Sequence, residues 1–97
     1  MKDTYIRVIH KASLADFAHA VNDEETSGTE FVKSSVEWYD NAFTNLAVFR
    51  LLDPPGTTVS GDVTVLPHGT DGPDGASLVW TGVVVVDGTN TAVSMFR

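Results

Sequence analysis

The sequence contains no cysteine. Disulfide bonds, thiolate metal sites, iron–sulfur clusters and a cysteine nucleophile are therefore excluded. Long apolar runs are also missing, since the four valines at 83–86 fall far short of the roughly 18 apolar residues that cross a bilayer. Residues 1–11 show no signal-peptide pattern. We therefore expect a cytoplasmic or virion protein without an export signal and without a membrane partner.

Positive charge is scarce, and in the second half of the chain it is nearly absent. Six basic residues stand against 13 acidic ones, for a formal net charge of -7, and no lysine or arginine occurs between Arg50 and Arg97. Because proteins bind phosphate backbones and anionic lipids through Lys and Arg, direct nucleic-acid binding is disfavoured. A charged partner is expected to be basic, although an acidic surface also serves solubility alone.

Motifs for catalysis or nucleotide binding are missing as well. The sequence has no G-x-S-x-G, no G-x-G-x-x-G and no P-loop. Its most site-like segment is HGTDGPDG at 68–75, which offers only His68, Asp71 and Asp74 as neighbouring ligands and lacks EF-hand spacing. Its Asp-Gly and Gly-Pro pairs are typical of turns. We predict a turn, no metal, no cofactor and no enzymatic activity.

One amphipathic helix is indicated near the N-terminus. Leu14, Phe17, Ala18 and Val21 follow the i, i+3, i+4, i+7 spacing of a buried helical face. Ser13, three residues before an aspartate, is a suitable N-cap. The pattern predicts a helix from about 13 to 23 or 24.

The other patterns indicate strands. Alternating or β-branched segments separated by turn residues predict strands at 4–10, 31–39, 46–52, 59–66, 77–86 and 91–96. Gly82 inside one of them suggests a bulge. The fold class is therefore α+β, a single domain over residues 1–97 in the order β-α-β-β-β-β-β. One helix packs on a mainly antiparallel sheet, either in two layers or curled into a small sandwich or barrel.

An aromatic cluster surrounds the first predicted hairpin. Trp38, Tyr39 and Phe43 lie there, with Asn41 and Asn45 nearby. An aromatic hairpin tip is a common recognition loop, and Phe43 is the strongest candidate for a contact residue. The alternative is that Trp38 belongs to the core and that Phe43 packs on the turn.

The valine run gives a second candidate contact. A strand that is apolar on both faces must be covered on both faces, which one helix in a small domain does with difficulty. We therefore predict that Val83 and Val85 contact another chain, in a homo-oligomer or a larger assembly.

These observations favour a non-enzymatic structural or assembly subunit that acts through protein–protein contacts, such as a small viral (phage) accessory protein. The alternative is an acidic inhibitor that mimics nucleic acid, in the manner of anti-CRISPR proteins, and blocks a basic groove. A small-ligand binder is the third hypothesis. The inhibitor would act through the carboxylates of the first half of the chain: Asp16, Asp23, Glu24, Glu25, Glu30, Glu37 and Asp40.

Overall fold

The computed structural model describes residues 3–10 and 13–97, which form one helix and six strands in the predicted β-α-β-β-β-β-β order. The α+β class is confirmed. The elements are β1 (Thr4–Ile9), α1 (Leu14–Glu25), β2 (Thr29–Tyr39), β3 (Ala42–Leu51), β4 (Thr64–Pro67), β5 (Leu78–Val86) and β6 (Thr89–Phe96).

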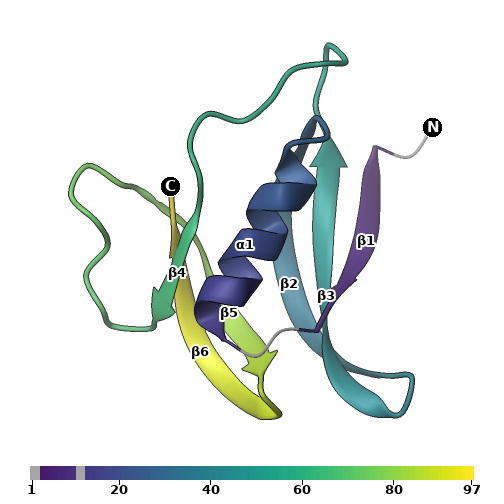
Figure 1. Cartoon of the computed structure of the whole chain (residues 1–97), viewed down its shortest axis with the longest axis vertical. Coiled ribbons are helices and arrows are strands. Elements are labelled where there is room, and N and C mark those ends of the chain that lie inside the picture. The colour runs from purple at the N-terminus through teal and green to yellow at the C-terminus, as the bar shows by residue number, and fades with distance from the viewer. Residues whose placement is uncertain (1–2, 11–12) are drawn as a thin grey trace.

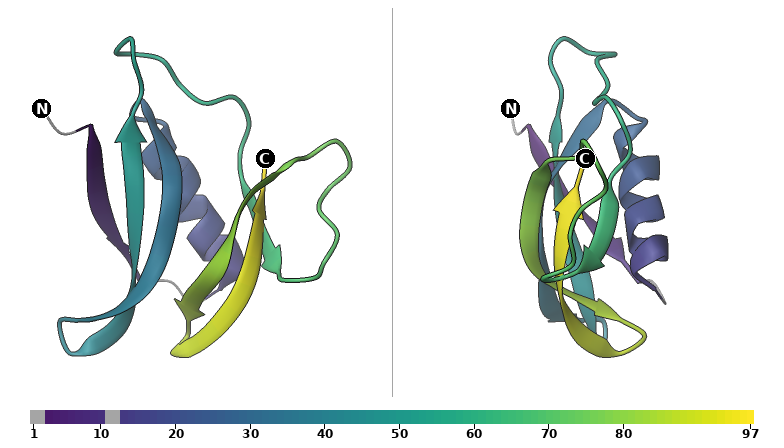
Figure 2. Two further views of the ribbon diagram at one scale, coloured as in Figure 1. Left: turned by 180° about the vertical axis from the view of Figure 1, so that it is seen from behind. Right: turned by 90° about the vertical axis from the view of Figure 1, so that its left-hand side faces the viewer.

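The strands form two antiparallel three-stranded sheets, in the orders β1-β3-β2 and β4-β6-β5, and no barrel closes among the described residues. The sheets lie edge to edge, with β2 beside β5, and α1 covers one face of the pair (Figure 1). No helix of the described residues covers the opposite face (Figure 2). The shortest extent of 16 Å matches a single sheet layer and a single helix layer.

Helix α1 occupies the predicted position. The Ser13 side chain accepts a hydrogen bond from the Asp16 N–H at 3.1 Å, which satisfies one free donor of the first turn. Phe17, Ala18 and Val21 are buried, as the spacing predicts. They meet core side chains from both sheets and from Val63 just before β4, so one core holds the two sheets together. The sheet residues of this core are Ile9, Phe31, Ala47, Phe49, Val65, Val84, Val93 and Met95.

The first hairpin is tighter than predicted. Strand β3 begins at Ala42 rather than at residue 46, because Asp40 and Asn41 alone make the turn, with φ of 52° and 66°. A two-residue turn with both φ positive matches the twist of the paired strands. Asp87 and Gly88 make the second hairpin turn in the same way, with φ of 48° and 74°.

A bulge in β2 corrects the expected faces of that strand. The register shifts between Phe31 and Lys33, so Val32 is the extra residue. Simple alternation would place Val32 on the same face as Val36, but the bulge separates them and Val32 is 42% exposed. Phe31 takes the core position instead.

The prediction of a bulge at Gly82 was wrong. In β5 the register shifts between Leu78 and Trp80, and Gly82 pairs regularly with Val93. Gly82 instead leaves room for the Trp80 indole, because a Cβ at this position would overlap the ring. The ring lies edge-on to Phe31, with centroids 5.4 Å apart.

The strand predicted for 59–66 is much shorter in the structure, where β4 covers only Thr64–Pro67. Val63 is buried, but its backbone is bound by the side chain of Asn22 rather than by a strand. Of the alternating valines, Val63 and Val65 are buried, but only Val65 lies in a strand ladder.

Candidate protein-contact site

The β2–β3 hairpin ends in an exposed aromatic cluster made of Trp38, Tyr39 and Phe43, which we call the aromatic tip. Trp38 is 65% exposed and Phe43 is 60% exposed. Their rings meet edge to face with centroids 5.0 Å apart, as partners across the ladder. Tyr39 is 53% exposed. The alternative in which Trp38 belongs to the core is therefore wrong.

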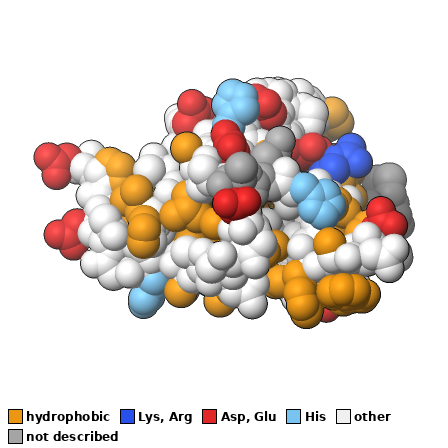
Figure 3. Space-filling view, turned by 60° about the horizontal axis from the view of Figure 1, so that its bottom comes forward, with side chains coloured by type: hydrophobic (Ala, Val, Ile, Leu, Met, Phe, Trp, Pro, Cys, Tyr) orange, Lys and Arg blue, Asp and Glu red, His pale blue; other side chains and the backbone are white. Residues whose placement is uncertain are grey.

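The surroundings of the aromatic tip are acidic. Glu37 and Asp40 flank the aromatic residues, and residues 36–45 contain no lysine or arginine. Asp87 lies in the turn of the β5–β6 hairpin, which ends on the same side of the molecule (Figure 1). Figure 3 looks onto this end, where hydrophobic and acidic side chains lie open to solvent.

The two asparagines predicted beside the aromatics have different places. Asn41 is exposed in the turn. Asn45 is fully buried, and its side-chain amide binds Val85 across the boundary between the two sheets and Ile9 of the neighbouring strand β1 in its own sheet. Asn45 therefore stabilises the fold and is not available to a partner. It lies on β3, two residues after Phe43 of the aromatic tip.

The valine run is covered mostly by the protein itself. Val84 is fully buried in the core and Val85 is 8% exposed, and the Asn45 amide binds both backbone groups of Val85. Val83 is 43% exposed on the face without a helix. Of the two valines predicted to touch another chain, Val83 is therefore the accessible one.

Most of the seven acids proposed for a nucleic-acid mimic already have partners within the chain. Glu24 accepts hydrogen bonds from the Tyr5 hydroxyl at 2.5 Å and from Arg7 Nε at 3.2 Å. Glu30 pairs with Arg50, and Asp23 lies 3.3 Å from His19. Of the remaining four acids, Asp16, Glu37 and Asp40 are exposed, and Glu25 is buried.

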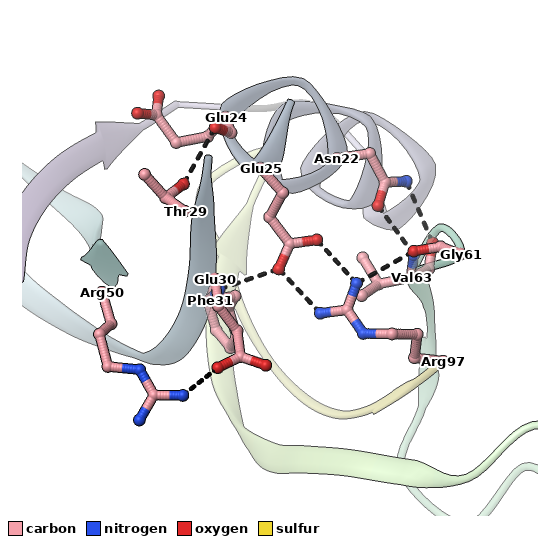
Figure 4. A network of polar contacts seen from close by, with 10 residues as sticks. All are labelled: Asn22, Glu24, Glu25, Thr29, Glu30, Phe31, Arg50, Gly61, Val63 and Arg97. Atoms are coloured by element: carbon pink, nitrogen blue, oxygen red, sulfur yellow. Dashed lines mark hydrogen bonds and ion pairs between the residues drawn. The ribbon is translucent and has the colours of Figure 1, made fainter. Parts of the chain in front are cut away.

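Glu25 is the buried acid, only 3% exposed. Arg97 donates to both of its oxygens, at 2.8 and 2.7 Å, and the Phe31 N–H donates at 2.9 Å (Figure 4). The Glu25 hydrogen bond raises the pKa of Arg97, against the opposing effect of burial. Glu25 is therefore held as a structural group and is not available to a partner.

The segment at 68–75 is a connection between β4 and β5, as predicted. Thr70 N–H donates to Pro67 O at 3.1 Å, and Ala76 N–H donates to Pro73 O at 3.0 Å. Gly72 packs on the Phe96 ring. Among the described residues, no group of three or more His, Asp or Glu is placed to hold a metal ion.

A surface depression of about 220 Å³ lies between α1 and the loop before β4, lined by Asn22, Glu25, Thr26 and Asp62 among others. Its one buried acid, Glu25, is already bound by Arg97. The depression therefore presents no free buried acid or base.

Sequence reasoning missed the exposure of β1. The residues of β1 alternate, so Ile6 and Val8 share one face, but that face is the one without a helix, where Ile6 is 58% and Val8 is 39% exposed. An alternating strand shows which residues share a face, and only the tertiary structure shows which face is covered.

The helix of the described residues has 12 residues, and it is too short and too polar to span a membrane. Comparisons with protein-family models, with curated proteins and with solved structures found no match to this chain.

Proposed function

We propose that the protein is a non-enzymatic assembly subunit that binds another protein through the aromatic tip. The observation that carries the proposal is the exposure of Trp38 and Phe43, at 65% and 60%, on a stiff two-residue hairpin. Aromatic side chains dominate the energetics of protein interfaces, and a rigid loop loses little conformational entropy on binding.

The chemistry of the tip also indicates the chemistry of its partner. The edge-to-face pair of Trp38 and Phe43 fits an apolar pocket, and Glu37 and Asp40 beside it favour basic groups at the rim of that pocket. Because an apolar centre supplies affinity and the charged rim mainly supplies association rate, added salt should slow binding more than it speeds dissociation.

Site-specific crosslinking in cells of the native source tests the proposal. A photoreactive phenylalanine analogue at Phe43 should crosslink to one protein, whereas the same analogue at Leu78, which is 59% exposed on the other sheet, should not. The captured protein is then purified and titrated with this chain. Replacing both Trp38 and Phe43 by alanine should weaken binding by about 30-fold or more, as for other interface hot spots.

The matched control is Leu78→Ala, which removes a similarly exposed apolar side chain and should leave the affinity unchanged. Equal binding by the Trp38→Ala/Phe43→Ala variant and the wild type would overturn the proposal. The acidic-inhibitor alternative has less support, because Glu24, Glu25 and Glu30 are engaged by cations of the same chain.

A further inference from the structure

Three places where a sheet edge meets another part of the chain are closed by specific side chains. At β5 the Asn45 amide binds both the N–H and the C=O of Val85. At β2 the Glu25 carboxylate accepts from the Phe31 N–H. Ahead of β4, Asn22 binds both backbone groups of Val63. Closing edges in this way prevents unwanted strand pairing.

The outer edge of β1 is different. Leu51 N–H donates to Asp3 O at 2.7 Å, so Asp3 and Leu51 form a hydrogen-bonded pair. Hydrogen-bonded and non-hydrogen-bonded pairs alternate along the β1–β3 ladder, so the pairs of β3 with Thr4, Ile6 and Val8 are of the second kind. The peptide groups of Thr4, Ile6 and Val8 therefore point away from β3. Among residues 3–10 and 13–97, nothing binds these outward groups. Strand β1 lies at the end of the row of strands in opposite views (Figures 1 and 2).

The side chains of this edge suit another strand. Ile6 is 58% exposed and Val8 is 39% exposed, and neither charge nor proline interrupts the outward positions 4, 6 and 8. Exposed apolar edges without such protection are templates for strand addition.

We propose that a second copy of this chain adds to β1, antiparallel, with the two-fold axis at Ile6. In this register Ile6 faces Ile6 of the other copy and Val8 faces Thr4. Each facing pair exchanges two backbone hydrogen bonds, about six in all for this short strand. The β1-β3-β2 sheet of one copy and the same sheet of the other copy then form one continuous sheet.

Charge complementarity favours a second copy over an unrelated strand. The same register brings Arg7 opposite Tyr5 of the other copy, at the closer spacing of a non-hydrogen-bonded pair. Glu24 lies directly beside Tyr5, bound to its hydroxyl. The Arg7 side chain is 59% exposed and bonds Glu24 of its own copy only through Nε. Its terminal nitrogens are therefore able to reach Glu24 of the other copy, and symmetry makes this contact twice.

Sedimentation equilibrium over a concentration series tests the proposal, with Ile6→Lys compared against Leu78→Lys. The two positions are matched, with 58% and 59% exposure. The wild type and Leu78→Lys should form a dimer with the same dissociation constant, and Ile6→Lys should raise that constant by at least tenfold. A strictly monomeric wild type, or equal dimerisation of the two lysine variants, would overturn it.

Ile6→Pro is a second test that spares the fold. Its N–H points outward, so proline removes no hydrogen bond to β3 and blocks only the open edge. Circular dichroism should show an intact fold, and sedimentation equilibrium should give a monomeric mass. A folded Ile6→Pro variant that dimerises like the wild type contradicts the proposal.

Charge reversal identifies the partner as the same chain. Arg7→Glu alone and Glu24→Arg alone should each weaken the dimer, because each places like charges across the interface. An equimolar mixture of the two variants should recover dimerisation as a heterodimer, since each Arg then faces a Glu. No recovery in the mixture would count against this register. The Trp38→Ala/Phe43→Ala variant should dimerise normally, which separates this proposal from that of the aromatic tip.

Discussion

The side-chain amide of Asn45 binds both backbone groups of Val85. Its Oδ1 accepts from the Val85 N–H at 2.8 Å and its Nδ2 donates to the Val85 C=O at 2.8 Å. Nδ2 also donates to Ile9 O at 3.1 Å. Asn22 binds Val63 in the same way, at 2.8 and 3.2 Å. In both places an asparagine side chain stands where a neighbouring strand would continue the sheet.

Asn45→Ala is expected to destabilise the fold by about 3 kcal/mol, because it leaves the N–H and C=O of Val85 buried without partners. Urea unfolding followed by tryptophan fluorescence measures the loss. Asn90→Ala, at an exposed asparagine, is the control and should change the free energy of unfolding little. A loss at Asn45 no greater than at Asn90 would mean that the amide is not needed.

Arg97→Ala is expected to cost about 3–5 kcal/mol, since it leaves the buried Glu25 carboxylate without its cation. The double variant Glu25→Gln/Arg97→Ala should be more stable than Arg97→Ala alone, because glutamine still accepts from the Phe31 N–H and carries no charge. Chemical denaturation of the three proteins checks this order. If the double variant is less stable than Arg97→Ala, the burial of an uncompensated charge does not explain the loss of stability in Arg97→Ala.

Alkaline pH should weaken the fold through Tyr5. Burial, together with the hydrogen bond to Glu24, raises the pKa of the Tyr5 hydroxyl above its ordinary value of 10.0. A raised pKa means that the contribution is fully present below about pH 10 and is lost as the pH rises through the folded-state pKa. In a Tyr39→Phe background, phenolate absorbance should titrate above pH 10 when folded, and Tyr5→Phe should flatten the alkaline fall in stability.

Gly82→Ala should destabilise the protein by about 1–3 kcal/mol, as overpacking does in other cores. The new methyl group would overlap the Trp80 ring, which packs against Phe31. Tryptophan fluorescence and thermal unfolding report the displaced ring and the lower stability. Thr81→Ala, at the exposed neighbouring position, is the control and should leave the tryptophan fluorescence unchanged. Because alanine suits a strand better than glycine does, a Gly82→Ala variant as stable as the wild type would mean that the methyl group does not displace the ring.

Local patterns predicted the elements of this fold well. The helical spacing of Phe17 and Val21 located α1, and the strand patterns located four of the six strands closely, the exceptions being β3 and β4. The turn length at Asp40 and Asn41 was not predictable from composition, because asparagine and aspartate suit both two-residue and longer turns.

Long-range side-chain contacts were not predictable in this way. Asn45 and Val85 are 40 positions apart, and Glu25 and Arg97 are 72 apart, so no window of sequence joins them. The valine run illustrates the same limit. The run was expected to need cover from another chain, but Val85 is only 8% exposed and Asn45 of β3 binds its backbone groups. The aromatic tip was identifiable because its residues are neighbours in the sequence.

Side chains, not a backbone ladder, join the two sheets along β2 and β5. Shifting the register of a ladder by one residue would turn every side chain of the strand to the other face, so the pairing of two strands cannot change gradually. Contacts such as those of Asn45 and the Phe31–Trp80 pair change gradually with side-chain size and shape. The angle between the two halves of this molecule is therefore open to gradual evolutionary adjustment while each half keeps its own register.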